Sequence, residues 1–239
     1  MTLFVSDIHL GADRPDITEQ FEQFLTQSAP TAGALYILGD LFERWIGDDA
    51  AGEFEQRIAA SLRRLADRGV ALYFLHGNRD FLLGQDYARR AGMQLLPQPV
   101  VLDLGGHRTV LCHGDQLCTH DTGYQRYRTR ILDPQWQARM LARPLWFRSA
   151  VASLLRRISR WHNRDPATIR MDVAEEAVER MMLEHEADLM IHGHTHRPAR
   201  HPIVSGKYSS ERIVLGDWYS QGSVLIARDG KFELQSMER

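Results

Sequence analysis

The most regular feature of this 239-residue chain is an alternation of short apolar runs with longer amphipathic stretches. Each apolar run has the length of a buried strand and ends in a polar or glycine-containing loop, whereas each amphipathic stretch repeats apolar residues at helical spacing. The predicted strands are residues 3–6, 34–38, 72–75, 109–111 and 189–191, and the predicted helices are residues 18–28, 54–68 and 172–186. This alternation predicts an α/β protein whose strands are covered by helices.

Toward the end of the sequence the strand pattern continues without helices. Residues 212–215, 222–228 and 231–235 have the apolar content of strands. Asp229 and Gly230, between the last two, are typical of a two-residue turn that needs positive φ. We therefore expect an antiparallel hairpin at this end of the sheet.

Residues 123–163 interrupt the alternation. They are rich in arginine and in large apolar residues, with tryptophan at 136, 146 and 161. Proline is tolerated in the first turn of a helix but not in its interior, so prolines divide such a segment into short helices. The prolines in and just after this segment are Pro134, Pro144 and Pro166. We predict that residues 122–168 form a helical cap, inserted within a single domain that spans residues 1–239.

Five short polar motifs follow directly after apolar runs. The loops at the carboxyl ends of strands in an open α/β sheet meet at one edge, so side chains far apart in sequence can form one site there. The carboxylates, amide and imidazoles of these motifs suit first-row divalent metals, and two such ions about 3.5–4 Å apart would clamp a phosphoryl group. The candidate ligands are Asp7, His9, Asp40, Asn78, His113, His194 and His196.

Each motif taken alone has an ordinary structural explanation. An Asp-x-His sequence is more often a capped turn than a pair of ligands, and Asn78 after Gly77 is typical of a turn that tolerates positive φ. The occurrence of five such motifs at strand ends in one chain favours the metal site. Histidines without this setting are interpreted as structural or exposed: His76, His107, His120, His162, His185 and His201.

These motifs resemble the calcineurin-like metallophosphoesterase superfamily, whose motif set reads DxH, GD, GNH, a histidine and GHxH. The resemblance spans nearly the whole chain and implies a β-sandwich flanked by helices. It further implies that Asp7, His9 and His196 hold one metal ion. Asn78, His113 and His194 would hold the second ion, and Asp40 would bridge the two.

One position departs from the superfamily pattern, because Arg79 stands where GNH has histidine. An arginine with a pKa above ~12 cannot protonate a leaving group, but it can bind phosphate oxygens and stabilise spread charge. A phosphate leaving group, with a second pKa of about 6, does not need that proton. The substitution therefore favours cleavage of a P–O–P bond over an alkyl phosphodiester. The alternative is that Arg79 only pairs with Asp80.

Charge is distributed unevenly, although the formal net charge is only −2. From Asp121 to Arg164 ten arginines and two acidic residues give +8, so the rest of the chain carries −10. Three roles fit such a cap: a hairpin packed on the core, a nucleic-acid surface, or a surface for anionic lipid. The run of Leu145, Trp146 and Phe147 favours lipid, and the acidic remainder would repel a long nucleic acid.

The composition indicates the compartment. With Cys112 and Cys118 as its only cysteines, the chain has no disulfide framework and suits a reducing environment. The sequence starts MTLFVSDIHL, without the features of an export signal, and no apolar run approaches the roughly 20 residues of a membrane span. We expect a cytoplasmic protein that contacts the membrane peripherally, and no obligate protein partner is evident.

Four longer runs resemble one family within the superfamily, the UDP-2,3-diacylglucosamine pyrophosphatases of lipid A biosynthesis. The runs are residues 36–43, 45–49, 76–83 and 191–198. The resemblance implies manganese-dependent attack on the α-phosphorus of UDP-2,3-diacylglucosamine, giving UMP and 2,3-diacylglucosamine 1-phosphate (lipid X), on the cytoplasmic face of the inner membrane. It implies catalytic roles for Asp40, Asn78, Arg79, His113 and His194.

The same resemblance implies a set of substrate contacts. These are Asn78, Arg79, Asp121, Ser159, Asn163 and His194. The family tends to place a lysine shortly after the asparagine, whereas this chain has Arg164-Asp165-Pro166. The alternatives that remain are a soluble phosphodiesterase or dinucleoside polyphosphate hydrolase, and a scaffold that keeps the fold without catalysis. A scaffold is expected to have lost ligands, and all seven candidates are present.

Overall fold

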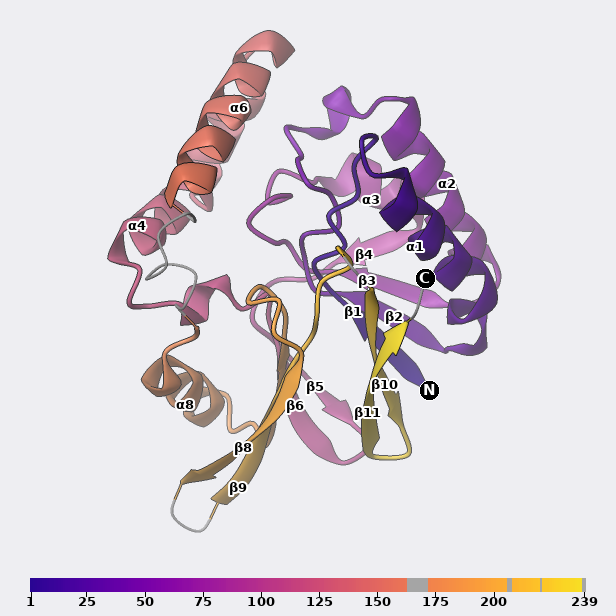
Figure 1. The fold of residues 1–239 in the computed structure, drawn as a ribbon, viewed down its shortest axis with the longest axis vertical. Coiled ribbons are helices and arrows are strands. Elements are labelled where there is room, and N and C mark those ends of the chain that lie inside the picture. Colours follow the sequence, from indigo (N-terminus) through magenta and orange to yellow (C-terminus); the bar gives the residue numbers. More distant parts are fainter. Residues whose placement is uncertain (163–171, 206–207, 220, 238–239) are drawn as a thin grey trace.

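The computed structural model describes residues 1–162, 172–205, 208–219 and 221–237, and these form two β-sheets packed face to face between helices (Figure 1). The first sheet has the strand order β11-β10-β1-β2-β3-β4 and the second has the order β5-β6-β7-β9-β8. The strands are β1 Thr2–Val5, β2 Ala34–Ile37, β3 Ala71–Phe74, β4 Met93–Leu95, β5 Val100–Leu104, β6 His107–Leu111, β7 Leu189–His192, β8 Ala199–Ser205, β9 Tyr208–Val214, β10 Gly222–Arg228 and β11 Lys231–Met237.

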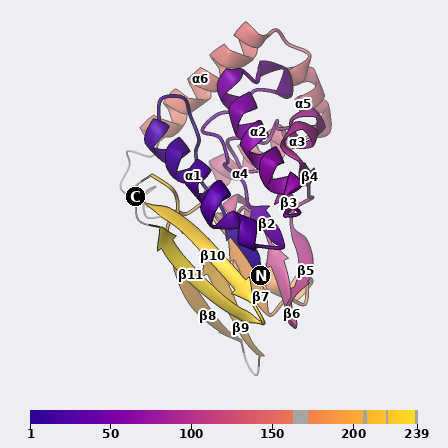
Figure 2. The ribbon, with the colours of Figure 1, turned by 90° about the vertical axis from the view of Figure 1, so that its right-hand side faces the viewer.

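Helices cover both outer faces of this sandwich. The helices are α1 Pro15–Gln27, α2 Glu53–Asp67, α3 Gln85–Ala91, α4 Thr122–Ile131, α5 Pro134–Leu141, α6 Leu145–His162 and α8 Glu175–Glu184, with short 3₁₀ turns at Ala29–Thr31, Asp48–Ala50 and Asp115–Leu117. Helices α1, α2 and α3 pack on the first sheet, and α8 packs on the second. Figure 2 shows the β10–β11 hairpin lying over β8 and β9. The predicted α/β sandwich flanked by helices is confirmed.

Alternation of side chains along the strands produces the layers. In the parallel pairing of β1 with β2, Leu3 is opposite Leu35, and both are buried with the helices of the first sheet. The next residue on each strand points the other way, because successive side chains of a strand face opposite sides. Phe4 is therefore buried between the sheets, with its ring stacked 5.1 Å from that of Tyr36.

Most predicted elements are present, with shifted ends. The helix predicted for residues 172–186 begins later, at Glu175. Before it, the Asp172 side chain accepts a hydrogen bond from the Val173 N–H, a local bond that competes with the helical backbone pattern. Asp229 and Gly230 have φ of 52° and 72°, which confirms the hairpin turn. The sequence pattern did not predict α3, β4, β5 and β8, which are short or interrupted by polar residues.

The prolines of the arginine-rich segment mark helix starts. Pro134 occupies the first turn of α5, and Pro144 immediately precedes α6. Pro166 lies outside the described residues. Figure 1 shows α6 standing apart from the sandwich on the side of α4. Within the described part of the chain, no helix is long and apolar enough to cross a membrane.

Candidate functional site

The seven predicted metal ligands come together at the carboxyl ends of the central strands. Asp7 and His9 follow β1, Asp40 follows β2, Asn78 follows β3, His113 follows β6, and His194 and His196 follow β7. Parallel strands deliver their following loops to the same edge, and the two sheets share that edge here. Sequence positions 189 residues apart, Asp7 and His196, thereby meet with Oδ1 and Nε2 at 3.2 Å.

The ligands fall into two overlapping groups. Potential ligand atoms of Asp7, His9 and His196 lie within 4.8 Å of one another, and so do those of Asp7, Asp40 and His113. The Asn78 side-chain oxygen completes the second group. It lies 3.0 Å from Nε2 of His113 and 3.1 Å from Nδ1 of His194. All seven side chains therefore face one small volume.

The backbone at this site is unusual. Seven described residues other than glycine have positive φ, and five of them are predicted ligands: Asp7 at 54°, His9 at 54°, Asp40 at 53°, His194 at 70° and His196 at 56°. Residues other than glycine rarely adopt positive φ, and backbone strain of this kind concentrates at functional sites. These residues, in the left-handed backbone conformation, turn the chain sharply at the strand ends.

Two glycines allow the loops to approach each other. A Cβ at Gly77 would collide with the carboxylate and backbone nitrogen of Asp40, and a Cβ at Gly193 would collide with Ser6 and Asp7. Bulkier residues at either position would push the ligand loops apart.

Asp80 fastens two of these loops together. It is fully buried and accepts hydrogen bonds from the backbone N–H of Leu41 at 2.7 Å, Gly77 at 2.8 Å and Asp40 at 3.3 Å. Burial and the neighbouring charge of Asp40 raise the pKa of Asp80 to about 7. These backbone partners argue against the alternative that Arg79 only pairs with Asp80. This supporting role of Asp80 has no signal in the sequence pattern.

Buried carboxylates raise the pKa of two of the candidate histidine ligands, His113 and His196. Burial lowers the pKa of His113, but the charges of Asp40 and Asp7 outweigh it and raise that pKa to about 9. Burial likewise lowers the pKa of His196, and its hydrogen bonds to Asp217 and Asp7 outweigh that effect, so its pKa is about 10.

The remaining two ligands with shifted pKa values titrate below neutral pH. Burial lowers the pKa of His194 to about 4, so this imidazole is neutral. Burial acts to raise the pKa of Asp7, but the hydrogen bond from His196 and the nearby imidazoles hold it below its usual range.

Both the charges and the donor set fit divalent metal ions. Without a metal, the buried carboxylates hold protons on two imidazoles, and a divalent cation would displace those protons. His113 directs Nδ1 to the carbonyl oxygen of Leu38 at 2.8 Å. Its other nitrogen, Nε2, faces Asn78 and is the atom that could bind a metal ion. A mixed set of imidazole, carboxylate and amide donors suits first-row metals.

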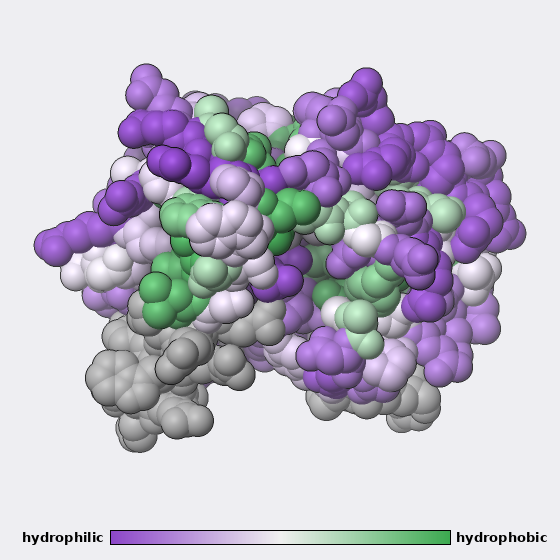
Figure 3. Space-filling view, turned by 90° about the horizontal axis from the view of Figure 1, so that it is seen from above, coloured by the Kyte–Doolittle hydropathy of each residue, from purple (hydrophilic) through white to green (hydrophobic). Residues whose placement is uncertain are grey.

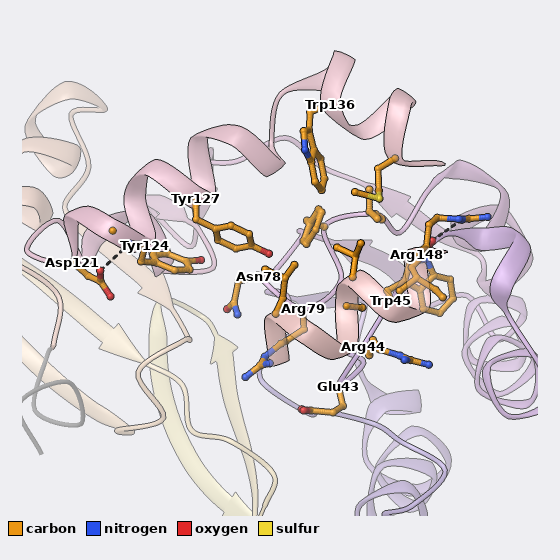
Figure 4. A pocket seen from close by; sticks show the side chains of 18 residues that line it. Glu43, Arg44, Trp45, Asn78, Arg79, Asp121, Tyr124, Tyr127, Trp136 and Arg148 are labelled. Carbon is orange, nitrogen blue, oxygen red and sulfur yellow. Dashed lines mark hydrogen bonds between the residues drawn. The ribbon is translucent and has the colours of Figure 1, made fainter. Parts of the chain in front are cut away.

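A cavity of about 430 Å³ opens beside this cluster (Figure 4). Its lining joins the ligand loops to helices α4, α5 and α6, and it is mostly apolar. The lining residues include Asn78, Arg79, Phe81, Asp121, Tyr127, Trp136, Met140, Val151 and Leu155. Figure 4 shows Tyr127 and Trp136 directed from α4 and α5 toward Asn78 and Arg79. The ligand cluster and the apolar cavity are thus adjacent.

Some of the predicted substrate contacts line the cavity, and others lie outside the described part of the structure. Arg79 and Asp121 line the cavity, and Asp121 also begins α4 by accepting the Tyr124 N–H at 2.8 Å. Ser159 lies on α6, where its side chain is outside the described part of the structure, and Asn163 lies outside the described residues altogether.

Helix α4 is fastened to the site by residues that sequence analysis missed. Asp115, two residues after His113, accepts hydrogen bonds from Tyr124 at 2.8 Å and from Arg128 at 2.7 Å. The Tyr124 ring also stacks 6.1 Å from that of His194. The signal in the sequence was the acid of the His113-Gly114-Asp115 motif, whose hydrogen bonds come from α4.

The model of the calcineurin-like phosphoesterase family matches residues 1–198. The chain therefore belongs to the calcineurin-like phosphoesterases. Within that family it groups with curated relatives named UDP-2,3-diacylglucosamine hydrolase, which confirms the resemblance seen in its sequence.

These relatives match over nearly their full length. The chain is 50% identical to the protein of Stenotrophomonas maltophilia (strain R551-3), covering 100% of this chain and 99% of the relative. It is 51% identical to the protein of Aeromonas hydrophila subsp. hydrophila, covering 98% and 97%. It is 46% identical to the protein of Escherichia coli O81 (strain ED1a), also covering 98% and 97%.

Proposed function

We propose that this protein hydrolyses the pyrophosphate bond of UDP-2,3-diacylglucosamine, with water attacking the α-phosphorus, to give UMP and 2,3-diacylglucosamine 1-phosphate. The observation that carries the proposal is the direct adjacency of a seven-ligand cluster, Arg79 and an apolar cavity. The names of the relatives support the same substrate. In this proposal residues 122–168 form a cap inserted within one metallophosphoesterase domain, residues 1–239.

Two divalent ions, which we propose to be manganese, complete the site. Asp7, His9 and His196 would hold one ion, Asn78, His113 and His194 the other, and Asp40 would bridge them. When bound, such ions polarise phosphoryl oxygens and activate water.

Arg79 is the protein group that addresses the reacting phosphates. Its side chain lines the cavity, and its buried Nε has no hydrogen-bond partner among the described residues. A guanidinium in that state is ready to donate to phosphate oxygens and to stabilise charge that accumulates on them. The leaving sugar phosphate needs no proton from it, so Arg79 suits this substrate.

The apolar cavity would receive acyl chains. Trp136, Met140 and Leu155 line it on the cap side, and Phe81 lines it on the body side. A soluble dinucleotide or diester would have no use for such a lining. We further propose that Asp121, Ser159 and Asn163 contact the glucosamine end of the substrate, with Asn78, Arg79 and His194 at the phosphate.

Peripheral membrane contact would bring the cap to the substrate, at the cytoplasmic face of the inner membrane. Three apolar side chains of α6 are exposed: Leu145 by 44%, Trp146 by 72% and Leu154 by 56%. Figure 3 shows apolar residues gathered on the face seen from above, framed by hydrophilic ones. Arginines in the same segment would attract anionic lipid headgroups.

Hydrolysis of UDP-2,3-diacylglucosamine in mixed micelles by metal-stripped protein tests the proposal, with UMP release followed with and without manganese. Manganese-dependent UMP formation is the expected result. If the protein cleaved a soluble diester or dinucleotide and left the lipid intact, the substrate assignment would fall. Activity restored equally by every divalent ion would remove the manganese preference.

A further inference from the structure

Two carboxylates outside the proposed ligand set lie behind the histidines of one metal position. Glu43 Oε2 is 3.1 Å from Nδ1 of His9, and Asp217 Oδ2 is 3.2 Å from Nδ1 of His196. The Nε2 atoms of the two rings lie 3.3 Å apart, and both face Asp7. Each imidazole therefore has one nitrogen near the proposed metal position and the other within 3.2 Å of a carboxylate oxygen.

The Asp217 carboxylate is held in place from two sides. Its Oδ1 accepts the backbone N–H of Tyr219 at 2.9 Å. The ring of the intervening Trp218 is fully buried against two phenylalanines of α1, and the Trp218 backbone N–H donates to the Asp7 carbonyl at 3.2 Å. The segment that carries Asp217 is thus anchored in the core and to a ligand residue.

Tyr219 links this segment to Glu43. Its ring stacks on His9, with centroids 5.0 Å apart and planes 9° apart, and its hydroxyl lies 3.4 Å from Glu43 Oε2. The Glu43 carboxylate lies within 3.1 Å of His9 Nδ1, although the two groups are not aligned for a hydrogen bond. Glu43, Asp217 and Tyr219 together surround the outer edges of His9 and His196.

The second metal position lacks comparable support. His113 directs Nδ1 to a neutral acceptor, the Leu38 carbonyl. Among the described residues, no carboxylate outside the proposed ligands lies within 4.0 Å of a ring nitrogen of His113 or His194. Asp115 is nearby, but its charge is paired with Arg128.

We propose that Glu43 and Asp217 are positioning residues that make the Asp7–His9–His196 position the tighter of the two, so that it fills first. This inference rests on the metal assignment proposed above. A carboxylate behind a ligating imidazole fixes its orientation and raises its basicity, and losing such a partner weakens metal affinity by roughly 10–100-fold. The second position lacks the metal affinity that such carboxylates contribute, so it should bind its ion more weakly.

Titration of the metal-free full-length protein with Mn²⁺ tests this, using chelator competition for the two dissociation constants and electron paramagnetic resonance for the state of the ions. We expect two separate steps, first an isolated ion and then a coupled pair. Asp217→Asn and Glu43→Gln should each weaken the first step by roughly 10–100-fold. The second step should change little.

Asp188→Asn is the matched control, because Asp188 pairs with His107 at 3.5 Å on an exposed surface. It should alter neither step. Asp217→Glu keeps the carboxylate and should retain more first-step affinity than Asp217→Asn, which separates charge from packing. Circular dichroism verifies that each variant is folded.

Equal dissociation constants in the unaltered protein, or variants that weaken both steps alike, would overturn the inference. Equal losses in Asp217→Glu and Asp217→Asn would also do so. No substrate enters this experiment. Failure to release UMP with a normal two-step titration would therefore remove the proposed reaction and leave the inference standing.

Discussion

The carboxylate of Asp40 accepts the backbone N–H of Arg79, with Oδ1 and N 2.8 Å apart. The proposed bridging ligand is thereby joined to the residue proposed to bind the phosphates. A shift of the Asp40 loop would move the Arg79 backbone with it, so the proposed metal position and the base of the Arg79 side chain keep a fixed relation. Since the backbone makes this bond, substitutions of the Arg79 side chain leave it intact and test the guanidinium alone.

Replacing Arg79 by histidine should change the preferred leaving group. The UDP-lipid activity is expected to fall by roughly 10²–10³-fold, the usual loss for one donor to a charged transition state. Relative activity toward alkyl phosphodiesters should rise, because histidine can donate a proton. The ratio of kcat/KM for the two substrates is the measurement. Arg44→His, at another arginine lining the cavity, is the control, and an unchanged ratio in Arg79→His would refute the argument.

Stabilisation by manganese should increase with pH. In the metal-free protein His113 has a pKa of about 9 and His196 of about 10, both above the ~6.5 of an unfolded histidine. Their protonation stabilises the metal-free fold fully below about pH 6.5, and this stabilisation is lost as pH rises through 9 to 10. Metal must displace the same protons.

Thermal unfolding with and without Mn²⁺ at pH 6.5 and 8.5 measures the effect. The increase in Tm caused by the metal should be larger at pH 8.5. Calorimetry in buffers of different ionisation enthalpy should detect proton release on binding. A metal-induced Tm shift that decreased with pH would contradict this account.

Asp80→Asn should destabilise the fold by roughly 2–3 kcal/mol, because one amide oxygen cannot replace a carboxylate that accepts three backbone N–H groups. The loss should be smaller at pH 8 than at pH 6, because the pKa of Asp80 in the folded protein, about 7, lies above the ordinary value of 3.8, so the stabilisation that Asp80 contributes falls as pH rises through 7. Urea unfolding gives the free energy. Asp103→Asn, at an exposed acceptor of one N–H, is the control and should cost less than about 0.5 kcal/mol.

Filling the cavity should weaken binding of the diacyl substrate. Ala152 lines the cavity on α6, so Ala152→Phe is expected to raise KM for the long-chain substrate about tenfold and to change little for a short-chain analogue. Ala150→Phe places the same ring on an exposed position of the same helix and should have no effect. Equal effects on both chain lengths would argue against acyl chains in the cavity.

Trp146→Asp should reduce binding to anionic vesicles by at least about tenfold, because burial of a large apolar side chain contributes roughly 1.5–3 kcal/mol. Vesicle co-sedimentation measures the partition. Leu183→Asp is the control, since Leu183 is 70% exposed but lies on α8, on the other sheet. Equal losses in both variants would remove the assignment of α6 as the contacting helix.

The fold class, and the presence of polar side chains at the strand ends, could be predicted from the sequence because both depend on local pattern. Strand periodicity places Leu3 and Leu35 on one face, and a polar motif after a strand end predicts a side chain at the edge of the sheet. The position of Asp7 and His9 at that edge was predictable in this way, whereas the departure at Arg79 was visible only from the resemblance to the GNH motif. Proline chemistry likewise predicted where α5 and α6 begin.

The residues that support the candidate ligands from behind and beside could be found only in the tertiary structure. Asp217 contacts His196 and Asp80 joins the Asp40 and Gly77 loops only because distant segments are brought together. An acidic residue in a loop has no periodic signature, since its partner is set by packing rather than by neighbours in sequence. The same holds for the cavity, whose lining comes from separate helices and loops. Its volume depends on how α4, α5 and α6 pack, which no local pattern encodes.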